Sequence, residues 1–513
     1  MRPTFMGFET SKSSIFANQK SLDIVGNNLA NTDTNGYTRQ RADRVSVYPG
    51  SYRARVATSR VGLTGQGVET VGVSQMRDSF LDKRFRDEYS KSSYHAQAGQ
   101  LLEDIQSALG DGNSIKDEAG LLGGINQMFA ALMGYVNDPT TQSESNLVLS
   151  AFRNMTQVLQ QLDAKLTNVA KQQKEDMGIT VDRTNEIMKQ IAHLNEMISN
   201  DSTVTLDPNK EYFRPNELLD QRNLLLDELA SYGNINVTEK ADGSVDVEMG
   251  GHKAVSGKTY GELQMKGNDD GTVSLKWMDS GENTKLTGGT ILAYQDFING
   301  RGTHIQTNNE TLQQGIPYYR DRLDTFAAAL AHVANNTVPE YDEATGKPME
   351  DPVTKNIIYK KLLSSGGDGT DPVGAGNITI SQEWTQNGAA YFISKGDEQV
   401  EDYAQKLAYA LTKDSYSFED YGEKFSGTFA EYEIDFIGKL GTDIAYQNGR
   451  FDSTAKVADD FLDRRDAISG VSRDEETADM LKYQKSYEAA ARMMTTLDDL
   501  LDVLINRTGR AGL

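Results

Sequence analysis

The stretch MLKYQKSYEAAARMMTTLDDLLDVL, residues 480–504, decides how this chain folds. Its apolar residues recur at alternating intervals of three and four positions, which is the pattern of a coiled-coil seam. The residues of that seam are Met480, Tyr483, Tyr487, Ala490, Met494, Leu497, Leu501 and Leu504. A helix with such a seam buries it against other helices, either inside an ordinary globular core or in a pair with a second seam.

A second apolar stripe near the start of the chain offers such a partner. Its residues recur every seven positions with one intermediate contact, and they are Phe8, Ile15, Leu22, Val25 and Leu29. Neither stripe has a partner nearby in sequence, so we predict that the two terminal helices pair with each other as a coiled coil. Ser11 and Asn18 stand where a strong coiled coil places aliphatic residues, so we expect the termini to become ordered only on assembly.

Composition excludes several classes of partner. The formal net charge of −23 argues against nucleic acid, because a phosphate-binding surface needs clustered Lys and Arg. Short basic stretches at 39–44 and 53–60 are interpreted as solvated faces. Cysteine is absent, which excludes disulfides and thiolate metal sites and suits a protein that is exported unfolded.

Targeting signals are also missing from the sequence. No apolar run approaches the ~18 residues of a membrane helix, so we expect no membrane insertion. The first fourteen residues, MRPTFMGFETSKSS, lack the apolar core and the cleavage site of a signal peptide. The protein therefore either stays in the cytoplasm or leaves the cell by a route that ignores such signals.

Between the two ends, the hydrophobic pattern changes its period several times. Helical spacing extends over residues 8–31, 80–109, 121–136, 144–193, 215–230, 289–336, 401–410 and from 429 onward. Residues 37–75 look extended. Two hairpins are indicated where Asp242-Gly243 and Asp270-Gly271 separate short alternating runs, because Asp-Gly readily forms the tight turn between two strands.

These patterns predict an α+β fold with several domains. Paired terminal helices, a long helical bundle built from sequence-distant segments, and an inserted β-rich domain are its parts. We expect residues 1–50 with 474–513 to form the terminal coiled-coil domain, and 51–234 with 286–337 and 430–473 the helical rod. Residues 235–285 with 338–429 would form a β-rich, variable outer region. Enzymes rarely need a chain anchored by its ends, whereas subunits of tubular polymers do.

No motif in the sequence indicates catalysis. The five histidines show no metal-ligand spacing, and they are His95, His193, His252, His304 and His332. Neither a nucleotide-binding loop nor a nucleophile elbow occurs, and the acidic turns at Asp269, Asp368 and Asp371 lack the spacing of a calcium loop. We therefore predict no enzyme activity and no metal or cofactor site.

The segment NLANTDTNGY, residues 28–37, resembles the N-terminal signature of the bacterial flagellar rod, hook and hook-associated protein family. Its signature residues are Asn28, Leu29, Ala30, Asn31, Gly36 and Tyr37. Residues 469–506 resemble the terminal helix of the same family, and RPNELLDQRNLLLDELA, residues 214–230, resembles an internal helix of its hook-associated members. The middle of the chain, from about 236 to 430, is similar only loosely.

The resemblance implies a structural subunit at the hook–filament junction, exported by the flagellar type III apparatus. Its implied partners are other copies in a ring, the hook protein, a second junction protein, and a cytosolic chaperone at the C-terminal helix. A hook or distal rod protein is the alternative within the family. A flagellar polymer protein with a protease insertion is the alternative of another class, which the missing HExxH motif disfavours.

Overall fold

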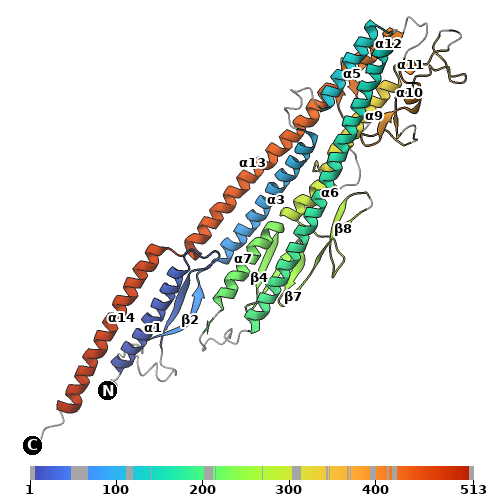
Figure 1. The fold of residues 1–513 in the computed structure, drawn as a ribbon. Coiled ribbons are helices and arrows are strands. Elements are labelled where there is room, and N and C mark those ends of the chain that lie inside the picture. The colour runs from blue at the N-terminus through green and yellow to red at the C-terminus, as the bar shows by residue number, and fades with distance from the viewer. Residues whose placement is uncertain are drawn as a thin grey trace, which may run out of the picture.

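The computed structural model is elongated, and helices from the two ends of the chain run side by side along it (Figure 1). The structure describes residues 6–47, 67–110, 120–139, 141–200, 212–213, 215–268, 270–302, 313–342, 345, 347–366, 369, 371–392, 400–412, 415–418 and 424–507. Predictions for residues 48–66, for Asp269 and for Asp368 lie outside the described residues.

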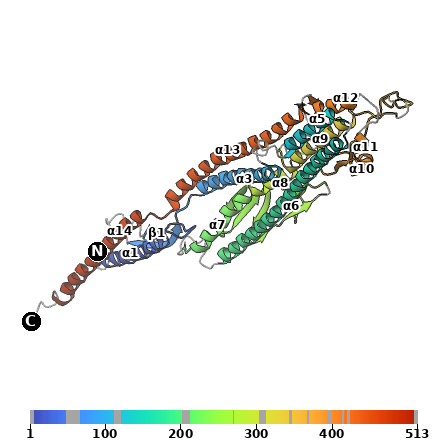
Figure 2. The same cartoon turned by 45° about the horizontal axis from the view of Figure 1, so that its top comes forward.

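Both chain ends lie at one tip of the molecule, where they form a small terminal unit (Figures 1 and 2). Helix α1 (Met6–Ala30) packs against α14 (Arg473–Asp502), which ends in a π-helical turn at Val503–Arg507. A hairpin of β1 (Gln40–Ser46) and β2 (Val68–Gln75) packs on α1, and β3 (Tyr212–Phe213) adds to β2 in parallel. The predicted pairing of the terminal helices is confirmed.

The rod consists of long helices that continue from this terminal unit. Helix α3 (Ser79–Leu109) packs along α13 (Phe429–Ser469), although more than three hundred residues separate them in sequence. Asp78 caps α3, since its side chain accepts a hydrogen bond from the Phe80 amide. Thr428 and Glu431 form a reciprocal capping box at the start of α13. The bundle is therefore built from sequence-distant segments, as predicted.

Five further helices of the described chain pack together in the rod. Helix α6 (Gln142–Asn200) is the longest, and it contacts α5 (Gly120–Asn137) at one end and α7 (Asn216–Tyr232) at the other. The shorter α8 (Thr290–Asn299) and α9 (Ile316–Asn335) also pack on α6. On α6, buried Phe152, Met155 and Leu159 recur at intervals of three and four, so one apolar stripe faces the core.

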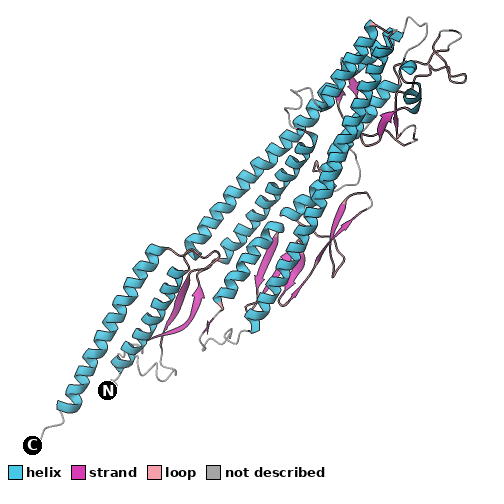
Figure 3. Ribbon diagram, viewed as in Figure 1, coloured by secondary structure: helices cyan, strands magenta, loops and turns pink. Residues whose placement is uncertain are grey.

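A small β unit lies against α6 (Figure 3). Its antiparallel sheet has the order β4 (Ile235–Glu239), β5 (Val245–Met249), β6 (His252–Ser256) and β7 (Thr259–Tyr260), beside a hairpin of β8 (Leu263–Gly267) and β9 (Val273–Trp277). Both predicted hairpins are confirmed, since Gly243 and Gly271 occupy their turns with φ of 81° and 84°.

The end opposite the termini carries short elements around an aromatic core. They are β10 (Leu363–Ser365), β11 (Ile378–Ile380), α10 (Gln382–Asn387), α11 (Ala389–Phe392), α12 (Val400–Thr412), β12 (Tyr416–Ser417) and β13 (Ser426–Gly427). Trp384 packs edge-on against Phe152 of α6, with ring centroids 5.3 Å apart.

One continuous hydrophobic core runs through the rod, the β unit and the outer end. The buried apolar residues of the terminal unit are not part of it, and they are Ala17, Ile24, Val25, Val73 and Ala490. The terminal unit must therefore be joined to the rod mainly by polar contacts.

Within the described ranges, no helix is both long and apolar enough to cross a membrane. No group of His, Asp or Glu among those same residues could hold a metal ion.

Candidate assembly site: the terminal helix pair and its joint with the rod

The two terminal helices run antiparallel. A Cβ atom on Gly7, at the start of α1, would lie 3.2 Å from Leu497 Cδ1 near the end of α14. At the other end of the pair, Asn28 Nδ2 donates to Glu476 Oε2 over 3.1 Å, across 448 positions of sequence. The absence of a side chain at Gly7 lets the two helices approach closely at the tip.

The predicted C-terminal seam lies along α14 on the side of α1, with graded burial. Ala490 is buried, whereas Met480, Tyr483, Met494, Leu497 and Leu501 are half-buried. Tyr487 is 37% exposed and Leu504, in the π-helical turn, is 55% exposed. The single chain therefore covers the seam only in part.

The predicted N-terminal stripe is covered unevenly as well. Val25 is buried at 4% exposure, whereas Phe8, Ile15, Leu22 and Leu29 are half-buried. The most enclosed face of α1 is instead rich in small and polar residues: Ser11, Ala17, Asn18, Ser21, Ile24 and Asn28. Ser11 and Asn18, the polar positions that the heptad pattern singled out, are thus enclosed in the structure.

Arg44 of β1 explains part of this polar face. Its guanidinium donates to the Ala17 carbonyl over 2.8 Å and to Asn18 Oδ1 over 3.3 Å, and it also donates to the Ser21 hydroxyl. The same guanidinium lies 4.8 Å from the ring centroid of Tyr483 on α14, within the range of a cation–π contact. One arginine therefore ties the hairpin to both terminal helices, a role that the sequence pattern did not reveal.

Asn28 of the signature segment is the centre of the joint. It is 1% exposed, and its amide uses all its hydrogen-bonding capacity. Nδ2 donates to the Gln40 carbonyl over 2.9 Å and to Glu476, while Oδ1 accepts from the Gln40 amide over 3.0 Å and from the Tyr37 hydroxyl over 2.8 Å. This side chain therefore connects α1, β1 and α14 at one point.

Arg39 joins the same point to the end of the rod. Its guanidinium pairs with Glu476 over 2.6 Å and with Glu475 over 2.7 Å. Its amide donates to the Ser469 carbonyl at the end of α13, and its carbonyl accepts from the Met76 amide, each over 2.8 Å. The side chain of Glu476 is 1% exposed, so this pair is desolvated and sensitive to the loss of either partner.

The rest of the signature loop rests on α7. Gly36 has φ of +77°, and a Cβ atom there would lie 2.5 Å from the Leu224 side chain, so only glycine fits. The Thr38 amide and Gln75 Nε2 both donate to the Asp220 carboxylate, over 3.3 and 2.8 Å. Burial, followed by the nearby Asp220, Glu217 and Glu476 carboxylates, raises the pKa of the Tyr37 hydroxyl well above its usual range.

A chain of buried ion pairs continues from the joint into the rod. Asp82 accepts from Arg77 over 2.7 and 2.9 Å, and Asp227 of α7 accepts from Arg86 over 2.6 Å and from Arg465 of α13 over 2.7 Å. Burial opposes the charged form of Asp227, but Arg86, Arg465 and Arg77 outweigh it and lower the pKa of that carboxyl. The joint is thus held by charge and hydrogen bonds.

Three protein-family models match parts of this chain. A model of the flagellar hook-associated protein FlgK helical domain matches residues 102–345. A model of the flagella basal body rod protein matches residues 8–38, and one of the flagellar basal body rod FlgEFG protein C-terminal region matches residues 466–507. The last two matches cover α1 with the signature loop, and α14.

Two relatives are similar over nearly their full length, and one solved structure is similar over part of its length. Flagellar hook-associated protein 1 of Bacillus subtilis is 27% identical, over 100% of both chains. Flagellar hook-associated protein 1 of Escherichia coli is 23% identical over 96% of this chain and 98% of its own. The structure of the flagellar hook junction protein FlgK from Burkholderia pseudomallei is similar at a TM-score of 0.43 and 18% identity, over 56% of this chain and 47% of that one.

The terminal helices pair with each other and join the helical rod through the signature loop, and both ends of the chain match models of flagellar basal body rod proteins. These features together define a structural protein of the bacterial flagellum. Within that class, the match of the central helical region and the full-length similarity both point to the hook-associated proteins. Along nearly its whole length the chain is similar to flagellar hook-associated protein 1.

Proposed function

We propose that this chain is a structural subunit of the hook–filament junction, acting outside the cell as part of the flagellum. The similarity to flagellar hook-associated protein 1 supports this role, and one structural observation carries it further. Helix α14 and the π-helical turn after it leave large apolar side chains exposed in the single chain: Leu481, Met493, Leu500 and Ile505 are between 53% and 70% exposed. A helix that is apolar on more than one side requires neighbours beyond its own partner.

Those neighbours would be other copies of the chain, arranged in a ring with the α1–α14 pairs lining a tube. Contacts along the tube would be made by the hook protein below and a second junction protein above. In this arrangement the half-buried seam of α14 holds α1, while the exposed residues pack against adjacent subunits. The described residues from α3 to α13 would form the rod and the variable outer region.

Export through the flagellar type III apparatus belongs to the same proposal. The secretion signal would be read from the N-terminal region without cleavage, and a cytosolic chaperone would cover the C-terminal helix before export. The partly open seam of α14 supports this, because an amphipathic helix with exposed Met and Leu offers a chaperone an apolar face. Shed protein analysed by mass spectrometry should keep its N-terminal residues, apart from Met1.

Labelling in cells tests the location directly. An epitope tag placed at exposed Val353, in the outer region, leaves both terminal helices intact. Electron microscopy should show label confined to the boundary between hook and filament. Label along the whole hook would instead support a hook or rod protein. In a separate experiment, deletion of the gene should leave hooks that carry no filament.

A further inference from the structure

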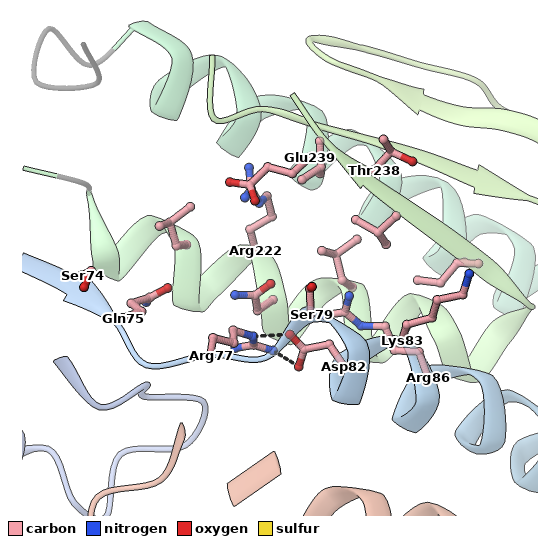
Figure 4. A pocket seen from close by; sticks show the side chains of 16 residues that line it. Ser74, Gln75, Arg77, Ser79, Asp82, Lys83, Arg86, Arg222, Thr238 and Glu239 are labelled. Atoms are coloured by element: carbon pink, nitrogen blue, oxygen red, sulfur yellow. Dashed lines mark hydrogen bonds and ion pairs between the residues drawn. The ribbon is translucent and has the colours of Figure 1, made fainter. Parts of the chain in front are cut away.

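A cavity of about 560 Å³ lies between α3, α7 and the β4–β5 hairpin, away from the terminal helix pair. Four cationic side chains contribute to its lining, from Arg77, Lys83, Arg86 and Arg222. Apolar side chains, among them Leu219, Ile235 and Val237, line another part. Figure 4 shows Lys83 and Arg86 on α3 and Arg222 on α7, on facing sides of this space.

The lining cations differ in how far their charges are already used. Arg77 donates two hydrogen bonds to Asp82, and Arg222 donates to the Gly243 carbonyl over 2.7 Å. Arg86 is only 6% exposed; its Nε donates to Asp227, but its buried Nη2 has no acceptor among the described residues. Lys83 is exposed and forms no ion pair within that part of the chain.

A buried guanidinium N–H group without an acceptor is costly, and an ordered water or an ion from outside the chain is one of the ways in which such a group is satisfied. Of the two lining acids, Asp82 is already bonded to Arg77, which leaves Glu239, an exposed residue. The lining therefore keeps a positive balance in a chain whose formal net charge is −23. An anionic group is the complement of this cavity.

We propose that the cavity binds a carboxylate, supplied in the assembled flagellum by an Asp or Glu side chain of a second copy of this chain. The cationic side holds the carboxylate, and the apolar side receives the short carbon stem that carries it. Copies with 75 acidic and 52 basic residues repel one another when packed in a ring, so a contact that neutralises a neighbour's carboxylate favours assembly. The identity of this occupant rests on the proposed function, whereas carboxylate binding by the monomer does not.

The first test uses the purified full-length monomer and glutarate, which carries carboxylates on a short carbon chain. Calorimetric titration at constant ionic strength should show saturable binding, with chloride giving none. Lys83→Glu should weaken this binding at least tenfold. The matched control is Arg84→Glu, which makes the same charge change one residue along α3 at a position outside the cavity lining, and should bind as the native protein does. No saturable binding, or equal weakening in both variants, would overturn the carboxylate site.

The second test identifies the source of the carboxylate. A carbodiimide joins an amine to a carboxylate in direct contact, so isolated flagella treated with it should yield a covalent dimer of this chain. Mass spectrometry should find Lys83 linked to an Asp or Glu residue, and Lys83→Gln should remove that link. Dimers that never contain Lys83 would overturn the second-copy occupant. Labelling at the junction is a separate measurement. If the chain is found at the junction but this link is absent, the second-copy occupant is wrong and the proposed function still stands.

Discussion

Gly36 illustrates how strongly one residue can be determined by its surroundings. Its positive φ is favoured by glycine alone, and the Leu224 side chain occupies the space that a Cβ atom would need. The signature loop can therefore lie against α7 only if this position has no side chain. The family signature at Gly36 has a steric cause that involves a helix nearly two hundred residues away.

Replacing Gly36 by alanine should destabilise the joint by about 1–3 kcal/mol, because the residue would be strained and would displace Leu224. Chemical denaturation followed by circular dichroism measures the loss. Gly26→Ala is the matched control, since a Cβ atom there meets nothing within 4 Å and α1 should gain about 0.5–1 kcal/mol. Equal stability of the two variants would contradict the steric account.

Glu433 is a second residue whose environment is unusual. It is 4% exposed on α13, and the Leu121 and Leu122 amides at the start of α5 donate to its carboxyl group. Burial outweighs these hydrogen bonds and raises the pKa of Glu433 to about 7. Its Oε2 atom has no hydrogen-bond partner within the described part of the chain, as expected for a carboxyl group that is hard to ionise.

Stability should consequently depend on pH through Glu433. The folded pKa lies above the unfolded value, so the contribution is complete below about pH 4.5 and is lost as the pH rises to about 7. The loss amounts to about 3 kcal/mol at 1.36 kcal/mol per pKa unit. Urea denaturation of Glu433→Gln should show a smaller decrease between pH 5 and 7.5 than the native protein. An unchanged decrease would show that Glu433 is not responsible.

At the scale of elements, α1 and α14 form a pair that is only partly apolar. α14 buries Glu476 and Ala490 and leaves its remaining seam residues half-covered or exposed. The enclosed face of α1 is polar because Arg44 and the β1–β2 hairpin supply hydrogen-bond partners there. A helix can therefore bury a polar face when a third element supplies hydrogen-bond partners for the side chains of that face.

The double variant Leu497→Asp with Leu501→Asp should abolish junction assembly and leave the rod folded. Each Leu contributes about 1.5–3 kcal/mol when fully buried, and a carboxylate in its place adds a desolvation cost. Filament formation in cells and circular dichroism of the monomer are the measurements. Leu497→Met with Leu501→Met conserves volume and should assemble normally. Normal filaments from the Asp variant would refute the assembly role of the seam.

At the scale of the whole molecule, the terminal unit is far less enclosed than the rod. The continuous core includes residues of α3, α6 and α13 but none of α1 or α14. Local unfolding should therefore begin at the terminal pair, where few apolar contacts oppose it. Such a pair suits a subunit that completes its packing only beside its neighbours.

Hydrogen exchange of the monomer should reveal this difference. Amides of α1 and of residues 475–502 should exchange at least tenfold faster than those of the core-facing residues of α6. Protection of the terminal amides should then rise in isolated flagella, where neighbouring copies cover α14. Strong protection of both termini in dilute monomer would mean that the pair is a finished domain, and that assembly requires another trigger.

How well a feature of this fold can be predicted from sequence depends on how far apart in the chain its interacting residues lie. Helices such as 80–109 and hairpins such as the one at Asp270-Gly271 depend on hydrophobic period and turn residues within a short window, and their bounds agree with the structure within a few residues. The seam of α14 is local in the same sense. The division into domains, and the assembly role of the seam, remain predictions.

The sequence by itself therefore determined the elements of this protein, the pairing of its ends and its resemblance to flagellar hook-associated proteins, because periodicity and signature motifs lie in consecutive residues. Tertiary structure decided the joint. Asn28 with Glu476, Arg39 with Ser469, and Asp227 with Arg465 meet only after helices from distant parts of the chain have packed. Polar partners of this kind have no spacing rule, since their meeting depends on the position of whole helices.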